Sequence, residues 1–307
     1  MCQWLNRIDP QALTDEWKGA SSPMTGPFAW QNIVLPPLAD RTKSKPRKDG
    51  VTMVIDTGLG LQETRDLLNL AGNFIDIIKL GFGSAYLYPE TILREKIALL
   101  KEHQIEICPG GTFLEIAVLQ DVWKQWMERC AEIGFTCVEV SDGTIDLPRP
   151  LRNQLIRYAQ KLDFQVFGEI GKKEDGSHLP VAEQLQQIEE DLAHGAKLVI
   201  IEGRESGKNV GMYEKDGSLR FADVEQLMKS GIDKTLVIWE APLKSQQVQF
   251  IKYFGANVNI GNIAPTAVLS LECLRQGLRS DTIPKKVVKP QQMEEHPANL
   301  SISSLIL

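Results

Sequence analysis

The amino-acid sequence predicts an α/β fold of the (β/α)8 TIM-barrel class. Short apolar segments rich in Val and Ile, typical of strands, recur along the chain, and most of them end in glycines and charged residues. Segments with the hydrophobic period of a helix lie between them. This alternation repeats eight times over about 230 residues, as expected for a parallel barrel.

We predict eight strands, each running into a polar turn. The clearest signal is Val199-Ile-Ile, which leads into Glu202-Gly-Arg-Glu-Ser-Gly-Lys208, where charged side chains gather among flexible glycines. A solvated turn with surface ion pairs is the alternative for this segment alone. The same form recurs in the other segments. In chain order the predicted strands are 51–56, 74–79, 105–108, 136–140, 165–169, 197–202, 236–240 and 257–260.

Helical periodicity fills the intervals, as in Val181, Leu185, Ile188 and Leu192. Several of these helices are predicted to end at left-handed glycine caps, at Gly72, Gly134, Gly195 and Gly255. A doubly wound open sheet is the alternative fold. Its dinucleotide fingerprint is missing, since neither Gly58-Leu-Gly60 nor Gly81-Phe-Gly83 has the required third glycine.

Composition predicts one large barrel domain over residues 51–280, with an N-terminal extension (1–50) and a C-terminal tail (281–307). The chain has 307 residues, 43% of them hydrophobic, and a net charge of −6, which argues against nonspecific nucleic-acid binding. No segment has the pattern of a signal peptide or membrane span, so we expect a cytoplasmic protein without a membrane partner. Five cysteines without paired spacing and four histidines argue against disulfide, zinc or histidine-based chemistry.

The two flanks are irregular. A basic cluster, Arg41 to Lys48, is expected to be a solvated linker. The apolar end, Leu300 to Leu307, is expected to dock either on its own barrel or on a neighbouring subunit, which leaves a homo-oligomer possible.

Three carboxylates are predicted to meet at the mouth of the barrel. The carboxyl ends of parallel strands share one face, and alternate residues of a strand point inward, so Glu139, Glu169 and Glu202 should converge. Carboxylates this close repel one another unless a cation lies among them, and Mg²⁺ prefers oxygen ligands. In the alternative, Lys79, Lys173 and Arg204 neutralise the carboxylates without a metal.

An anion site is predicted beside this cluster. The loop after the last predicted strand carries Gly261 and Asn262 and leads into a helix beginning near Ala264. Free backbone N–H groups and a helix N-terminus favour phosphate there. The residues thus describe a metal-assisted barrel enzyme for a small phosphorylated carboxylate.

Six phrases in order resemble the phosphosulfolactate synthase family, from about Leu35 to Thr282. They are Pro109-Gly-Gly-Thr, Val138-Glu-Val-Ser-Asp-Gly143, Glu169-Ile-Gly-Lys-Lys173, Val199-Ile-Ile-Glu-Gly-Arg-Glu-Ser-Gly-Lys208, Glu240-Ala-Pro and Asn257-Val-Asn-Ile-Gly-Asn262. The family commonly reads Asp-Lys-Gly and Trp-Gly-Thr-Ser where this chain has Asp56-Thr-Gly and Phe82-Gly-Ser-Ala.

The resemblance implies a Mg²⁺-dependent carbon–sulfur lyase that adds sulfite to phosphoenolpyruvate. The product would be (2R)-2-phospho-3-sulfolactate, in sulfonate and coenzyme M biosynthesis. Lys79, Arg204 and Lys208 would bind the phosphate and sulfite charges. Two other functions stay open: a repurposed, heat-tolerance-like barrel with little or no catalysis, and addition of another nucleophile to a similar acceptor.

A lysine would donate the proton that completes the addition. Strand alternation from an inward Glu169 carries Lys173 to the same side and turns Lys172 away, which favours Lys173 as the catalytic residue. Lys172 is the alternative donor, because Gly171 is able to break this alternation.

Overall fold

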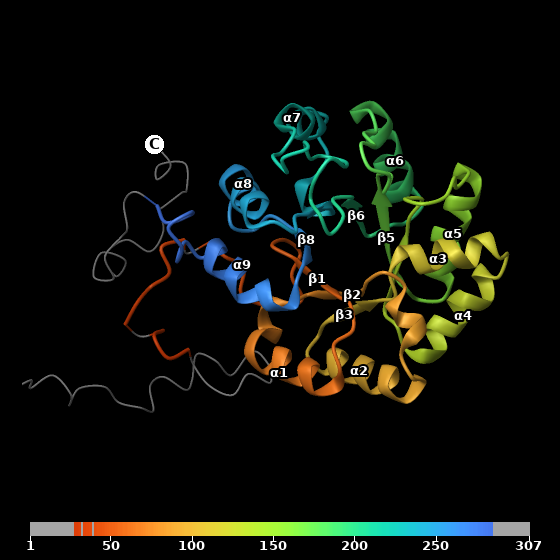
Figure 1. Ribbon diagram of the computed structural model, residues 1–307, viewed down its shortest axis with the longest axis horizontal. Coiled ribbons are helices and arrows are strands. Elements are labelled where there is room, and N and C mark those ends of the chain that lie inside the picture. Colours follow the sequence, from red (N-terminus) through yellow and green to blue (C-terminus); the bar gives the residue numbers. More distant parts are fainter. Residues whose placement is uncertain (1–27, 32, 39, 285–307) are drawn as a thin grey trace, which may run out of the picture.

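The computed structural model describes residues 28–31, 33–38 and 40–284 and shows eight parallel strands wrapped by helices (Figure 1). The strands are β1 (Thr52–Asp56), β2 (Ile77–Leu80), β3 (Glu106–Cys108), β4 (Cys137–Val140), β5 (Gln165–Ile170), β6 (Leu198–Ile201), β7 (Val237–Glu240) and β8 (Ile260–Ile263). The helices are α1 (Leu61–Ala71), α2 (Glu90–Glu102), α3 (Gly111–Leu119), α4 (Trp123–Ile133), α5 (Arg149–Lys161), α6 (Val181–Ala193), α7 (Phe221–Lys229), α8 (Lys244–Phe254) and α9 (Val268–Arg275).

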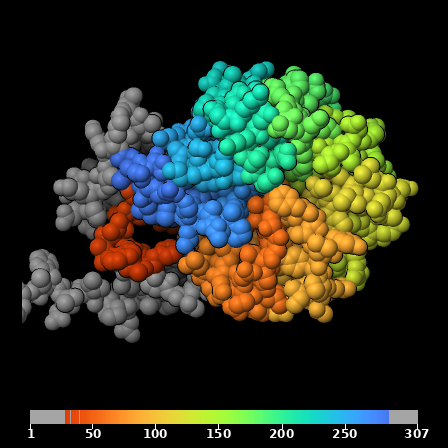
Figure 2. Space-filling model, in the orientation of Figure 1, coloured from red at the N-terminus to blue at the C-terminus, as the bar shows by residue number. Residues whose placement is uncertain are grey.

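The sheet curls into a nearly closed barrel, which confirms the predicted fold class. Its order is β3-β2-β1-β8-β7-β6-β5-β4, so the first strand lies between the second and the last. The two strands at the ends of this order, β3 and β4, are joined by a backbone hydrogen bond that Thr136 N donates to Ile107 O at 3.2 Å. The segments follow one another in chain order around the molecule (Figure 2), so the open-sheet alternative is wrong.

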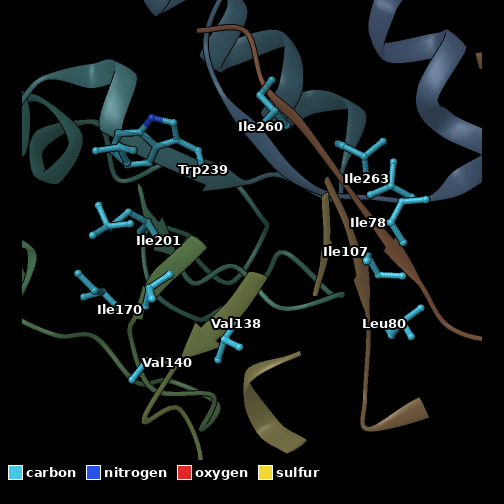
Figure 3. Close-up of a cluster of buried hydrophobic side chains, with 14 of the residues drawn as sticks. Ile78, Leu80, Ile107, Val138, Val140, Ile170, Ile201, Trp239, Ile260 and Ile263 are labelled. Carbon is cyan, nitrogen blue, oxygen red and sulfur yellow. The ribbon is translucent and has the colours of Figure 1, made fainter. Parts of the chain in front are cut away.

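Each strand separates two kinds of core. Side chains on the outer face pack under the helices, among them Ile78, Val138, Ile201 and Trp239 (Figure 3). The inner face forms a second, smaller cluster inside the barrel: Val51, Met53, Ile77, Cys108, Cys137, Phe167, Leu198, Ile200 and Ile238. Because side chains alternate along a strand, the next inward residue after several members of this cluster is charged. The fold thereby places an ionic layer above this apolar cluster, made of Lys79, Glu139, Glu169, Glu202 and Glu240.

The predicted first residues of two strands are wrong. β8 begins at Ile260, three residues after the predicted start at Asn257. The preceding asparagines serve as acceptors instead: Thr42 N donates to Asn257 Oδ1 and Val51 N to Asn259 Oδ1, both at 2.9 Å. Phe74 lies in a short 3-10 helix, Gly72–Phe74, so β2 starts later than predicted.

The glycine caps are partly as predicted. Gly134, Gly195 and Gly255 have positive φ angles of 108°, 104° and 93°. Gly72 does not, because with φ −55° it continues from α1 into the short 3-10 helix.

Three charges of the basic cluster, Arg41, Lys45 and Arg47, contact the barrel and are not part of a solvated linker, whereas Lys43 and Lys48 are exposed as predicted. Arg41 Nε lies 3.1 Å from Glu272, and Arg47 forms an ion pair with Asp76 at 2.8 Å. Lys45 Nζ donates to Gly72 O at 2.8 Å. The positive charges thus hold this segment against the amino ends of the strands.

The two predicted extensions are described only in part. Residues 1–27 of the N-terminal extension and 285–307 of the tail, including the apolar end, lie outside the described residues. Within the described part of the chain, no helix is long and apolar enough to cross a membrane.

Candidate active site

A cavity of about 330 Å³ opens at the carboxyl ends of the strands. Its floor is the ionic layer above the inner apolar cluster, and its walls come from the following loops. The lining residues are Ile55, Lys79, Gly81, Phe82, Gly83, Gly110, Gly111, Thr112, Glu139, Thr144, Glu169, Lys173, Glu202, Arg204, Glu205, Glu240 and Asn262.

Lys79 from β2 lies at the centre of the ionic layer. Its Nζ is 3.1 Å from Glu139, 3.4 Å from Glu169 and 2.8 Å from Glu240. Burial disfavours an ammonium, but these carboxylates outweigh it and raise the pKa of Lys79 well above its ordinary value. Lys79 is therefore a fixed internal counter-charge as well as a wall of the cavity.

Glu240 was not among the site residues predicted from the sequence. It ends β7 on the inward side and makes the shortest of the Lys79 contacts. The signal was present, since Glu240 follows a β-branched strand just as Glu139 and Glu169 do. The sequence alone does not indicate which strand-end carboxylate faces which lysine.

Lys173 brings the second cation. Its Nζ lies 2.7 Å from Glu169 and 3.6 Å from Glu202, and it donates to Thr112 Oγ1 at 3.2 Å. Burial lowers the pKa of this lysine, but Glu169 and Glu202 raise it further, so the net shift is upward and the group stays protonated.

The route by which Lys173 reaches the cavity differs from the predicted one. β5 ends at Ile170, and Gly171 has a φ of +124°, so strand alternation does not extend to residue 173. Instead, Lys173 N donates to Gly143 O at 2.9 Å, which ties the loop after β5 to the loop after β4.

Three backbone N–H groups orient the carboxylates. Gly111 N donates to Glu139 at 2.8 Å, and Gly203 N donates to Glu240 at 2.9 Å. Arg204 N donates to Glu202 at 2.6 Å. A Cβ on Gly111 would lie 2.6 Å from Glu139 Oε1, so the close approach at that position requires glycine.

The buried acids divide into two states. Burial, then the charge of Glu169, raises the pKa of Glu139 to about 8. Burial, followed by Glu169 and Glu240, raises the pKa of Glu202 well above its ordinary value. Burial also opposes ionisation of Glu169, but Lys173 and Lys79 outweigh it and lower that pKa. Ionisation is thus favoured at Glu169 and disfavoured at Glu139 and Glu202.

This arrangement leaves a negative excess when every acid is ionised, because two lysines face Glu139, Glu169, Glu202 and Glu240. Two protons or one divalent cation would balance it. One oxygen of each predicted ligand accepts no hydrogen bond from a described residue but lies near a lysine: Glu139 Oε2 is 3.1 Å from Lys79 Nζ, and Glu169 Oε1 and Glu202 Oε2 are 2.7 and 3.6 Å from Lys173 Nζ. By charge and donor type the cluster fits Mg²⁺.

The described residues do not form a complete metal cage. Among residues 28–31, 33–38 and 40–284, no three carboxylate, imidazole or thiol groups are arranged to hold a metal ion. Mg²⁺ usually needs no such cage, because one or two carboxylates with water and substrate oxygens complete its shell.

Arg204 and Asn262 extend the cavity wall. Both have left-handed backbones, with φ of 54° and 56°, a conformation that for non-glycine residues is found often at functional sites. Arg204 donates to Lys173 O at 2.9 Å and lies 3.7 Å from Glu205, so it does not neutralise the buried carboxylates. Asn262 is 5% exposed, and its Oδ1 accepts no hydrogen bond from the described residues.

Three predicted site residues do not line the cavity. Lys172 turns away and donates to Asp142 O and Ile145 O at 2.8 and 2.7 Å. Lys208 is exposed on the long loop after β6. Gly261 lies inside β8, where a Cβ would be 2.6 Å from Met53 Cε, so it is packed against the floor and is not in a phosphate loop.

The two departures from the family phrases differ in importance. Thr57 is exposed and lies outside the cavity lining. Asp56 beside it is buried against Lys96 of α2. Phe82, in contrast, lines the cavity with 62% of its surface exposed. Only the second departure therefore changes the cavity wall.

Comparison with known proteins gives a consistent result. The family model described as (2R)-phospho-3-sulfolactate synthase (ComA) matches residues 40–281. A phosphosulfolactate synthase from Methanothermobacter thermautotrophicus is 38% identical over 81% of this chain and 96% of its own length. One from Methanocaldococcus jannaschii is 40% identical over 77% and 94%. Protein HEAT-STRESS-ASSOCIATED 32 from Arabidopsis thaliana is 24% identical over 75% and 87%.

Proposed function

Since the chain belongs to the (2R)-phospho-3-sulfolactate synthase family, we propose that it adds sulfite to phosphoenolpyruvate, giving (2R)-2-phospho-3-sulfolactate. The observation that carries the proposal is the pairing of a protonated Lys173 with a buried carboxylate cluster in one cavity. Such a site supplies a proton beside a position for a cation, and the addition needs both.

The proposed step forms one carbon–sulfur bond. The sulfur lone pair of sulfite attacks the methylene carbon of phosphoenolpyruvate, and the π electrons move toward C2 and the carboxylate. A proton from Lys173 Nζ then adds to C2, and the lysine is reprotonated from solvent. Lys173 suits this role because Glu169 keeps its ammonium charged and, with Thr112, fixes its place.

We propose Glu139, Glu169 and Glu202 as the residues that hold Mg²⁺. The support is their shared excess of negative charge, because Lys79 and Lys173 offset only two of the four buried acids. When bound, the ion would stabilise the negative charge that develops on the substrate carboxylate. The substrate would complete the metal's shell, since the described carboxylates do not.

Glu202→Gln should weaken Mg²⁺ binding, measured by calorimetry, because it removes one anionic ligand. Unchanged Mg²⁺ affinity in Glu202→Gln would remove this residue from the ligand set.

The Mg²⁺ affinity of the wild-type protein should rise with pH up to about 8, since the raised pKa of Glu139 lets protons compete with the ion below that value.

Chelation of Mg²⁺ should stop turnover and leave the fold intact, because the apolar core does not depend on the ion.

Arg204→Lys should bind phosphoenolpyruvate at least several-fold more weakly than the wild-type protein. A guanidinium can hold phosphate or carboxylate with two parallel hydrogen bonds, whereas an ammonium of equal charge cannot. Titration with phosphoenolpyruvate in the presence of Mg²⁺ measures the change. Equal affinity would reduce Arg204 to its observed contacts with Lys173 O and Glu205.

A product assay tests the proposal itself. Incubation with phosphoenolpyruvate, sulfite and Mg²⁺ should give a new phosphosulfonate, detected by mass spectrometry. If only another nucleophile reacts with the phosphorylated acceptor, the enzyme class stands and the substrate assignment fails.

A relative named for heat stress is the reason to consider a second candidate. This candidate is a stress-related barrel with little or no catalysis. Against it stands the intact ionic layer, because buried like charges cost free energy and a site without function need not keep them. A folded protein that binds neither Mg²⁺ nor phosphoenolpyruvate would support this second candidate.

A further inference from the structure

Glu115 of α3 is a buried carboxylate that the proposed reaction does not use. It is 1% exposed and lies outside the cavity lining. Among the described residues it has no ion pair with a lysine or arginine, so hydrogen bonds stabilise it instead. Gly143 N and Thr144 N donate to it at 2.9 and 3.0 Å, and the hydroxyls of Ser141 and Thr144 donate as well.

All four donors come from one short segment, residues 141–144, which follows β4. A carboxylate that gathers two backbone and two hydroxyl donors fixes the conformation of such a segment more firmly than a single contact would. The result is one defined path for the loop after β4 along the edge of the cavity.

This loop supports Lys173 in two ways. Gly143 O accepts the hydrogen bond from Lys173 N at 2.9 Å. The lysine stem also passes directly over Gly143, since a Cβ there would lie 2.9 Å from Cγ, Cδ and Cε of Lys173. A shift of this loop therefore moves both the backbone and the side chain of Lys173.

The same helix contacts the other end of this side chain. Thr112, one turn before Glu115, accepts a hydrogen bond from Lys173 Nζ at 3.2 Å. α3 thus fixes the stem of Lys173 through Glu115 and the loop, and its ammonium through Thr112.

We propose that Glu115 is a positioning residue for Lys173: by holding residues 141–144, it sets the place from which the ammonium delivers its proton. The inference rests on the proposed function insofar as Lys173 is the proton donor. The positioning itself concerns only the contacts described above.

Glu115→Gln tests this directly. The amide nitrogen of Gln cannot accept the hydrogen bonds that one carboxylate oxygen of Glu115 accepts, so residues 141–144 lose part of their support. We expect kcat to fall by about 10- to 100-fold, the range for loss of a residue that orients a reacting group, with KM for phosphoenolpyruvate changed by less than about twofold. In a Lys173→Met background the same change should have no further effect, because the residue acts through Lys173.

Glu272→Gln is the matched control, since Glu272 is also a buried helical carboxylate but pairs with Arg41 at the opposite end of the barrel. It should leave kcat unchanged. Ser141→Ala, which removes one donor and keeps the carboxylate, should lower kcat in the same direction as Glu115→Gln but less. If Glu115→Gln does not fold, the kcat of Ser141→Ala tests whether the hydrogen bonds of Glu115 position Lys173.

An independent readout separates this inference from the proposed reaction. After reductive ¹³C-methylation of the lysines, the NMR signal that is lost in Lys173→Met reports on that ammonium. Glu115→Gln should shift it and Glu272→Gln should not, whether or not the protein makes a sulfonate. An unshifted signal, or equal losses of kcat with and without Lys173, would overturn the proposal.

Discussion

Lys173→Met is expected to lose turnover by about two to four orders of magnitude, the usual range for removal of a general acid. The reason is that Nζ of Lys173, the proposed proton donor, lies 2.7 Å from Glu169 inside the cavity. Methionine keeps a stem of similar length for packing on Gly143, so folding should be largely preserved. Steady-state kinetics with phosphoenolpyruvate and sulfite measures the loss, and circular dichroism checks the fold.

Lys172→Met is the matched control, since the neighbouring ammonium binds Asp142 O and Ile145 O outside the cavity. It should lower kcat only mildly. A large loss in Lys172→Met together with a small one in Lys173→Met would reverse the assignment and make Lys172 the donor.

Lys79→Met should be the most destabilising single change in the ionic layer, by about 3–5 kcal/mol, the usual cost of removing one partner from a buried ion pair. Lys79 is 6% exposed and touches three carboxylates, which would lose their shared cation. The loss should be larger at pH 8 than at pH 5, because the unpaired acids can take up protons at low pH. Urea unfolding at both pH values measures it.

Two variants make this result specific. Lys101→Met, at an exposed position on α2, should change the free energy of unfolding by less than about 0.5 kcal/mol. Adding Glu240→Gln to Lys79→Met should restore part of the stability, since it removes one of the stranded charges. A loss that is small and independent of pH would show that the carboxylates do not depend on Lys79.

The convergence of the ionic layer could be predicted from the sequence. Alternation within a strand and the common direction of parallel strands suffice to bring Glu139, Glu169 and Glu202 together with Lys79. These rules need only approximate strand ends, and errors of a few residues in β2 did not matter. What they do not give is the pairing within the layer, because inter-strand register decides that Lys79 lies nearest to Glu240.

Other features depend on contacts far apart in the sequence. β8 was predicted too early because Asn257 and Asn259 precede a glycine in the usual manner of a strand end, yet their side chains bind Thr42 N and Val51 N. Glu115 gave no signal at all, since an acidic residue on an apolar helix normally faces solvent. Its partners come from another loop, which only the folded chain brings within reach.

Isotope incorporation tests whether sulfite adds at C3 and a proton adds at C2. The reaction of phosphoenolpyruvate with sulfite is run in D₂O with Mg²⁺, and the product is examined by mass spectrometry and proton NMR. We expect a phosphosulfonate that carries one deuterium at C2 and keeps both original hydrogens at C3, and Lys173→Met should form it far more slowly. Deuterium at C3, or folded wild-type protein that forms no sulfonate, would contradict this expectation.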